Sequence, residues 1–404
     1  MTSGDLSAPE LREKFFHHVC QTSPAPLGIV VRSASGCEIV DHDGKKYLDL
    51  LAGMGVANVG HNHPQVVTAV KRQLSRHLHV SVYGEMIQEP QVLLAENLAR
   101  LSPGDLSVVY FTSSGAEAIE GAMKTARKFT DRPRFVAFHG SFHGDTFGAL
   151  SLNGNPMYRE PFEPLVPVVD FLPYGDVGAV DRIGHDVAAV FVEPIQSEGG
   201  VRIPPDDFLP ALRHRCHEVG ALLVLDEVLT GFGRTGKLFA CNHWEVVPDL
   251  LVLAKALGGG LPLGAFVGTE ETMATLSQAP PLGHVTTFGG HPLSCAAGLA
   301  ALEVLQNERL IERAHELGED WRRELAKELG PYVRQVRGKG LLVGIEFPSA
   351  DFTRRFTARC LDLGLIVNWT LHCDNVVSLA PPLCIEAGEL EEATKRMRLA
   401  AQSA

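Results

Sequence analysis

The chain has 404 residues, and its 48 acidic side chains outnumber its 36 basic ones, which gives a formal net charge of −12. Nucleic-acid-binding proteins normally carry a basic excess or a basic stripe, so this balance argues against that function class. Apolar residues make up 45% and charged residues 21% of the chain, as in ordinary globular proteins. Domains contain about 100–200 residues, so the length predicts two or three of them.

The sequence contains no sign of a membrane segment or a secretory leader. No apolar run approaches the ~20 residues that a membrane-spanning helix needs. The first ten residues include Asp5 and Glu10 and lack the basic start and apolar centre of a signal peptide. The eight cysteines form no Cys-X-X-Cys pair. Two histidine pairs, His139 with His143 and His214 with His217, have a spacing that resembles metal ligands, but no Cys or carboxylate joins either pair at ligand spacing. We therefore expect a cytoplasmic protein with reduced thiols and no metal site.

At its two ends, the chain predicts smaller mixed elements. The first 50 residues predict a helix and then a hairpin around residues 41–44, which is too little to fold alone. The last hundred predict helices at 292–306, 310–328 and 353–363, with a strand at 341–347. We expect residues 1–55 to pack with a C-terminal small domain formed by residues 291–404, and residues 56–290 to form a large domain.

Between these ends, short β-branched runs alternate with longer segments that have helical periodicity. The predicted strands cover residues 108–111, 135–138, 188–192, 222–226, 250–254 and 265–268, and the clearest helices cover 116–129 and 208–219. Alternating strands and helices are typical of a largely parallel sheet with helices on both faces. The fold class predicted by this pattern is therefore α/β.

Two of the predicted strands end in residues that can carry chemistry. The run 222–226 ends in Asp226, and the run 250–254 is followed by Lys255 and a glycine-rich turn. Ligands of open parallel sheets bind beyond the carboxyl ends of the strands. One interpretation is an ion pair. The other is a pyridoxal phosphate site, in which the lysine forms a Schiff base and the carboxylate keeps the pyridine nitrogen protonated.

Three further features fit the second interpretation. The segment 112–117 follows a strand and opens a helix, and free N–H groups at a helix N-terminus bind phosphate. Ser113 or Ser114 also fits there as a plain helix cap. Phe142 and Val228 follow predicted strands and are placed to cover the two faces of a cofactor ring.

A competing motif lies nearby. Residues 231–236 match Gly-X-Gly-X-X-Gly after a strand, as in nicotinamide dinucleotide sites. Such a site needs a helix that opens directly after the glycines, and residues 237–244 show no clear amphipathic pattern. We therefore assign no dinucleotide site to this segment.

Taken together, the motifs resemble those of the class III (ornithine/4-aminobutyrate type) pyridoxal phosphate-dependent aminotransferases of fold type I. The resemblance covers nearly the whole chain, and the order and spacing of the motifs make it specific. The matching segments are 60–64, 114–118, 142–144, 192–196, 226–228, 230–236, 254–257, 286–292 and 380–383. The resemblance implies a large domain with a mostly parallel seven-stranded sheet and a smaller α+β domain.

The resemblance also implies roles for individual residues. Lys255 would form the Schiff base with pyridoxal 5'-phosphate and shuttle the substrate proton, and Asp226 would pair with the pyridine nitrogen. The other residues that it places at the cofactor are Ser114, Gly115, Ala116, Phe142, His143, Glu193, Val228 and Thr287. Thr287 would reach the phosphate of the neighbouring subunit, which implies a homodimer with active sites at the interface.

The chain departs from the family pattern around the substrate. Ser378 and Asp145 stand where many relatives carry arginine, and Leu229 stands where a glutamine often contacts the cofactor. Glu198, the usual partner of the missing C-terminal arginine, is retained. We expect a substrate pocket that includes Asp145, Glu198, Ser378 and Tyr83, without the usual grip on 2-oxoglutarate.

The sequence therefore predicts an aminotransferase that moves an amino group from a primary amine or amino acid, with an ornithine-like or ω-amino donor, to a keto acid or aldehyde. A racemase, epimerase or aminomutase of the same fold is the alternative. A protein that binds the cofactor without catalysis is a third hypothesis, which the retained Lys255 and Asp226 disfavour.

Overall fold

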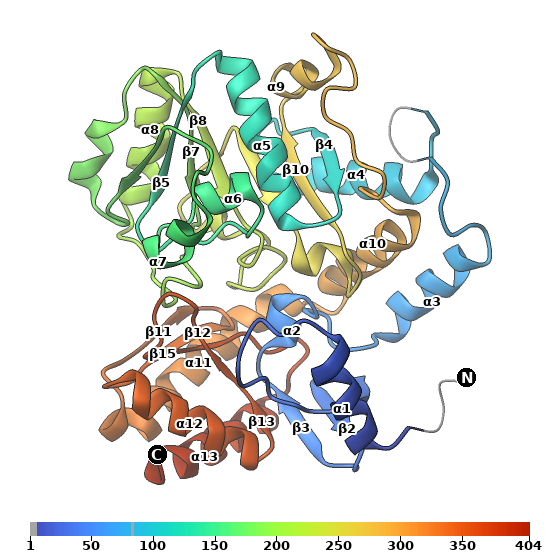
Figure 1. The fold of residues 1–404 in the computed structure, drawn as a ribbon, viewed down its shortest axis with the longest axis vertical. Coiled ribbons are helices and arrows are strands. Elements are labelled where there is room, and N and C mark those ends of the chain that lie inside the picture. Colours follow the sequence, from blue (N-terminus) through green and yellow to red (C-terminus); the bar gives the residue numbers. More distant parts are fainter. Residues whose placement is uncertain (1–5, 82–84) are drawn as a thin grey trace.

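A computed structural model describes residues 6–81 and 85–404 of the chain, so the predicted pocket residue Tyr83 lies outside the described residues. A seven-stranded sheet with the order β4-β10-β9-β8-β7-β5-β6 forms the upper half of the molecule in Figure 1. Its strands are β4 (Val108–Thr112), β5 (Arg134–Phe138), β6 (Val169–Leu172), β7 (Val187–Val192), β8 (Leu222–Asp226), β9 (Leu250–Leu253) and β10 (Gly264–Gly268). Only β10 runs antiparallel to its neighbours.

The predicted fold class is thus confirmed, and the six predicted strands are found with ends shifted by at most one residue. Strand β6 was not predicted from the sequence. This strand lies at the edge of the sheet, pairs only with β5, and alternates between part-buried and exposed positions over most of its length. It contains Asp170, so it lacks the continuous apolar run that identifies a buried parallel strand.

Helices cover both faces of this sheet because successive strand residues point to opposite sides. In β7, Ala189 and Phe191 join the apolar cluster under α5, and Val190 and Val192 join the cluster under α4, α8 and α10. The helices of this part are α3 (Pro64–Leu74), α4 (Glu89–Leu101), α5 (Gly115–Thr130), α6 (Phe147–Ser151), α7 (Pro156–Arg159), α8 (Phe208–Val219), α9 (Glu270–Ala274) and α10 (Pro292–Asn307).

Two four-stranded sheets lie in the lower half of Figure 1. One contains β1 (Val31–Ser35), β2 (Glu38–Asp41), β3 (Lys46–Asp49) and β13 (Leu365–Ile366). The other contains β11 (Gln335–Lys339), β12 (Leu342–Glu346), β15 (Val376–Leu379) and β14 (Asn368–Trp369). The helices around them are α1 (Ala8–His18), α2 (Ala52–Gly55), α11 (Leu310–Leu329), α12 (Ala350–Asp362) and α13 (Ala387–Gln402).

The two ends of the chain meet in the first of these sheets, where β3 pairs in parallel with β13. The predicted hairpin is present as antiparallel β2 and β3, and the Asp41 carboxylate accepts the N–H groups of Asp43 and Lys45 in its turn. Helix α10 packs against α3 and α4 of the large sheet's layer. The domain boundaries at residues 55 and 290 stay a prediction.

Over the described ranges, no helix is both long and apolar enough to cross a membrane. Within the same ranges, no three His, Cys, Asp or Glu side chains gather as a metal site would require. The eight cysteines are free thiols.

Candidate active site

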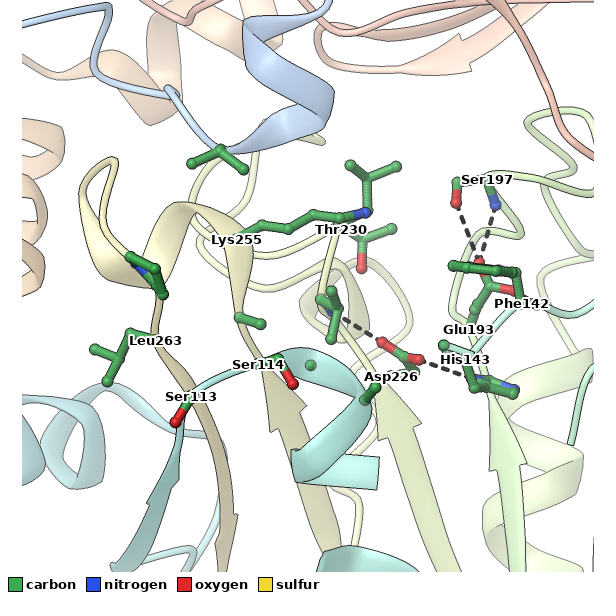
Figure 2. Close-up of a pocket in the computed structure, with 18 of the residues that line it drawn as sticks. Ser113, Ser114, Phe142, His143, Glu193, Ser197, Asp226, Thr230, Lys255 and Leu263 are labelled. Atoms are coloured by element: carbon green, nitrogen blue, oxygen red, sulfur yellow. Dashed lines mark hydrogen bonds and ion pairs between the residues drawn. The ribbon is translucent and has the colours of Figure 1, made fainter. Parts of the chain in front are cut away.

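A cavity of about 410 Å³ lies at the carboxyl ends of β8 and β9, where the sequence analysis placed the chemistry. Small-molecule sites commonly have volumes of about 300–1,000 Å³. The predicted residues that line this cavity are Ser114, Gly115, Ala116, Phe142, His143, Glu193, Asp226, Val228 and Lys255. Residues that end or follow five separate strands, β4, β5, β7, β8 and β9, therefore meet around one space (Figure 2).

Asp226 is the last residue of β8 and is only 5% exposed. Its Oδ2 accepts a hydrogen bond of 2.7 Å from Nδ1 of His143, and its Oδ1 accepts one of 3.0 Å from the backbone N–H of Val228 (Figure 2). These two donors hold the carboxylate in one orientation at the base of the cavity.

His143 lies behind Asp226, and its side chain is completely buried. Burial lowers the pKa of His143, but the hydrogen bond and the charge of Asp226 outweigh it, so the pKa is raised overall. Because a carboxylate only accepts, Nδ1 carries a proton. Nε2 has no hydrogen-bond partner among the described residues. His143 therefore orients Asp226 through its Nδ1–H.

Lys255 follows β9 and begins the 3₁₀ helix Lys255–Gly258, with a left-handed φ of 50°. Burial lowers its pKa, although the negative charges of Glu198, Asp226 and Glu193 oppose this shift. Over the described residues, no carboxylate oxygen comes within the 4.0 Å of an ion pair with Lys255. The ion-pair interpretation of Asp226 and Lys255 is therefore wrong, and the lysine reaches into the cavity instead (Figure 2).

The N-terminus of α5 forms a second side of the cavity. Oγ of Ser114 caps the helix by accepting the N–H of Glu117 at 3.2 Å, and the Glu117 carboxylate accepts the N–H of Ser113 at 2.7 Å. Ser114, rather than Ser113, is thus the capping residue. The first N–H groups of a helix have no partner within it, so those of Gly115 and Ala116 are available to an anion.

A third side of the cavity contains Glu193 and Phe142. Oε1 of Glu193 accepts the backbone N–H of Phe142 at 3.0 Å. Oε2 accepts the backbone N–H and the hydroxyl of Ser197 at 3.0 and 3.3 Å. Burial is the main reason that the pKa of Glu193 is raised to about 7. Glu193 thus fixes the loop that carries Phe142.

Four other predicted residues do not line this cavity. Thr287 is exposed on the loop before α10, and Asp145 is exposed after Phe142. Ser378 lies within β15, paired with Gly344 and Asn368. Glu198 is half-buried, and its Oε2 accepts the N–H of Leu371 at 2.7 Å.

Several lining residues were not predicted, among them Val56, Ser197 and the segment 260–263. Leu229, which stands where a glutamine often contacts the cofactor, and Thr230 of the matching segment 230–236 also line the cavity. Ser197 follows the matching segment 192–196 directly, so extending that segment by one residue would have found it. Val56 belongs to the N-terminal part of the chain, far from β8 and β9 in sequence, and no motif connects it to these strands.

The Gly-X-Gly-X-X-Gly segment has a structural role. The chain leaves β8 in turns and reaches only the 3₁₀ helix Ala240–His243, so no helix opens after the glycines. Arg234 of this segment is fully buried and donates to Oδ1 of Asn58 at 2.6 Å and to the carbonyls of Pro381 and Leu341. Its hydrogen bonds thus join three stretches of the chain that are far apart in sequence.

Known proteins resemble this chain over nearly its whole length. The family model for class-III aminotransferases matches residues 20–401. An acetylornithine aminotransferase from Methanopyrus kandleri is 44% identical over 96% of this chain and 97% of its own length. A putrescine aminotransferase from Pectobacterium atrosepticum is also 44% identical, over 90% of this chain and 80% of its own.

One solved structure adds the cofactor. An ornithine aminotransferase from Toxoplasma gondii, crystallised with partial occupancy of pyridoxal phosphate at its active site, superposes with a TM-score of 0.91. It is 32% identical and covers 98% of this chain and 94% of its own. The fold of this chain thus has a solved counterpart. The chain belongs to the class-III aminotransferase family, whose members depend on pyridoxal phosphate.

Proposed function

We propose that Lys255 is the catalytic lysine, that Asp226 holds the cofactor's pyridine nitrogen, and that residues 114–116 hold its phosphate. The structure offers two observations in favour of this fit. A Cβ on Gly115 would come within 3.0 Å of Val228, and one on Gly144 within 2.7 Å of the Ala116 side chain. The two glycines therefore let the N-terminus of α5 approach its neighbours closely, Gly115 toward the loop after β8 and Gly144 on the loop after β5. The oriented carboxylate of Asp226 provides the acceptor that a protonated ring nitrogen needs.

When bound, pyridoxal phosphate supplies a carbonyl that takes up the donor's amino group and a ring that withdraws electrons. The residues of the chain do the rest. The lowered pKa of Lys255 leaves its Nζ free to accept a proton from the donor carbon that bears the amine. Asp226, oriented by His143, keeps a negative charge beside the ring nitrogen. Phe142 and Val228 line the cavity from the loops after β5 and β8, and they would cover the two faces of the ring and exclude water from them.

The proposal includes a homodimer. Thr287 is exposed and does not line the cavity of its own chain. Its loop carries exposed apolar side chains, among them Leu282 and Phe288, and it meets the segment before α4 where the rings of His79 and Phe288 lie 5.2 Å apart. Exposed apolar groups gathered on one face favour burial against a second subunit.

A cytoplasmic location is the second part of the proposal that concerns the whole protein. The free thiols of the eight cysteines are the state that a reducing compartment maintains. Fractionation of the source cells, with activity measured in each fraction, tests this location.

For the donor, we propose a preference for substrates whose distal end is an amine or is uncharged. The observation that carries it is the sign of the charges around the cavity. Glu198, Asp226 and Glu193 all act on Lys255 as negative charges, and no arginine is among the cavity's lining residues in the described chain. A distal ammonium is attracted by this environment, whereas a distal carboxylate meets like charge and no guanidinium fork.

The test compares kcat/KM for putrescine, ornithine and glutamate in the wild type and in Ser378→Arg. A charged hydrogen bond contributes roughly 1.5–3 kcal/mol, so the wild type should prefer the diamine by about 10- to 150-fold. Ser378→Arg should narrow this preference, and Ser378→Gln, which adds bulk without charge, is the matched control. A wild type that prefers glutamate and gains nothing from the arginine contradicts the proposed pocket.

A second measurement separates an aminotransferase from an isomerase of the same fold. The enzyme is mixed with a donor in the absence of any acceptor. An aminotransferase releases one equivalent of ketone or aldehyde per active site and then stops, because its amino group has no acceptor. A racemase, epimerase or aminomutase continues to convert the donor over many turnovers.

A further inference from the structure

The connection between β14 and β15, here called the C-terminal turn (residues 370–375), has a fixed conformation. Oγ1 of Thr370 donates to the carbonyl of Cys373 at 2.8 Å, and the same carbonyl accepts the N–H of Val376 at 3.0 Å. The N–H of Thr370 donates to the carbonyl of Val376 at 2.9 Å. These bonds close the turn on itself, so its side chains are presented in one arrangement.

The C-terminal turn is fastened to the loop that follows β7. The backbone N–H of His372 donates to the carbonyl of Glu198 at 3.0 Å, and the N–H of Leu371 donates to the Glu198 carboxylate at 2.7 Å. The thiol of Cys373 lies 3.2 Å from the carbonyl of Gly199. Three contacts from successive residues thus hold the turn against the loop at the carboxyl end of β7.

His372 points from this turn toward the loop that follows β5. Its Nδ1 lies 3.2 Å from the carbonyl of Gly140, and because a carbonyl only accepts, Nδ1 carries the proton. Its ring lies 6.1 Å from the ring of Phe142, centre to centre, with an angle of 70° between the planes. The ring of Tyr158 lies 5.2 Å away, and the Tyr158 hydroxyl donates to the carbonyl of Leu371 at 2.9 Å.

Phe142 is therefore held from two directions. Glu193, at the end of β7, accepts its backbone N–H and fixes the main chain. His372 contacts the side chain in the edge-to-face arrangement that aromatic pairs prefer. The backbone contact comes from the sheet that carries Asp226, and the ring contact comes from the C-terminal part of the chain.

We propose that His372 is a positioning residue that sets the ring of Phe142 over the cofactor, and that Glu198 seats His372 for this role. The inference rests on the proposed function, in which Phe142 covers one face of the pyridoxal ring. It extends that function by making the C-terminal turn part of the cofactor site. Glu198 thereby acts on the site by accepting the backbone N–H groups of Leu371 and His372. This role does not require an arginine at position 378.

The test measures the affinity of the apoenzyme for pyridoxal phosphate, by quenching of intrinsic fluorescence, in His372→Ala and His372→Phe. An aromatic pair contributes enough that its loss should weaken the affinity by about 2- to 13-fold. His372→Phe keeps a ring beside Phe142 and loses the bond to Gly140, so it should recover the affinity to within about twofold. His214→Ala, at an exposed histidine on α8, is the matched control and should bind as the wild type does.

Two further readouts separate positioning from a loss of stability. The visible circular dichroism of the bound cofactor should fall in His372→Ala, because a looser Phe142 leaves the ring less asymmetric in its surroundings. The melting temperature of the apoenzyme should stay close to that of His214→Ala. Weakened binding that is matched by an equal loss of apoenzyme stability, with an unchanged circular dichroism signal, would overturn the inference.

Phe142→Ala distinguishes failure of this inference from failure of the proposed function. If Phe142→Ala weakens binding and His372→Ala does not, the role of His372 is wrong and the cofactor site stands. If neither weakens binding, the proposed place of Phe142 over the ring is wrong, and the inference about His372 is then wrong as well. If both weaken it, the double variant should lose less than the product of the two single effects, because the two rings act as one contact.

Discussion

The lining of the cavity on the large sheet and the contacts just outside this lining are built in different ways. On the sheet side, Asp226 and Lys255 end adjacent parallel strands, and each is fixed by the strand that precedes it. Outside the lining, His372 and Glu198 meet through a turn and a loop that are far apart in sequence. The residues that we propose for the chemistry are thus placed by neighbouring strands, whereas the residues that we propose for positioning are placed by contacts between separate parts of the chain.

Two consecutive residues at the end of β8, Asp226 and Glu227, also differ in whether they face the cavity or support the chain around it. Asp226 faces the cavity, and Glu227 faces away from it. The Glu227 carboxylate accepts the hydroxyl of Thr230 and the N–H groups of Ala240 and Cys241, each at 2.7 Å. It therefore holds the chain after β8 in place, and Asp226 is left for the ligand.

The largest effect is expected on the sheet side, from Lys255→Ala. Removal of Nζ takes away the only lining amine of the described cavity, so turnover should fall by at least about 1,000-fold. The protein should stay folded, because the lysine makes no ion pair in the described structure. Steady-state kinetics and the melting temperature, measured on the same preparation, check this. Turnover near the wild-type rate would remove Lys255 from the mechanism.

The next effect separates the two adjacent acids. Asp226→Ala should cost about 30- to 5,000-fold in kcat, as does truncation of a carboxylate beside a buried cation, with a modest change in stability. Glu227→Ala should instead leave three buried donors unpaired and cost about 3 kcal/mol or more of unfolding free energy. Kinetics and chemical denaturation of both variants test the division. Equal behaviour of the two would show that their opposite orientations do not matter.

An effect of intermediate size on activity tests whether each active site contains residues from both subunits of a dimer. Lys255→Ala protomers are mixed with Thr287→Ala protomers at limiting pyridoxal phosphate. If Thr287 serves the partner's site, a heterodimer carries both lesions in one site and none in the other, so random mixing should restore about a quarter of wild-type activity. Heterodimers that form and show no recovery would place Thr287 in the site of its own chain.

The smallest effect is a pH dependence of stability from Glu193. Burial raises its pKa from 4.5 to about 7, so the folded protein binds this proton more tightly than the unfolded chain does. The resulting stabilisation is complete below about pH 4.5 and is lost as the pH rises through about 7. Glu193→Gln does not titrate. The melting temperature of the apoenzyme variant should therefore rise relative to the wild type between pH 5 and pH 8, by roughly a few degrees. A constant difference across this range would contradict the raised pKa.

The sequence by itself determined the parts of the protein whose physics is local. The short apolar runs that lead into Asp226 and Lys255 predicted the strands and the cavity at their carboxyl ends, because parallel strands bring those ends together. The segment 112–117 predicted the helix opening at Ser114 because capping depends on a few consecutive residues.

Only the tertiary structure decided which distant side chains join them. The edge strand β6, the lining residue Val56 and the contact of His372 with Phe142 have no local signature. Each depends on how separately folded stretches pack, and packing is set by the shapes of whole surfaces rather than by residue spacing. For the same reason the sequence named Glu198 as a pocket acid, but only the fold showed its carboxylate holding the C-terminal turn.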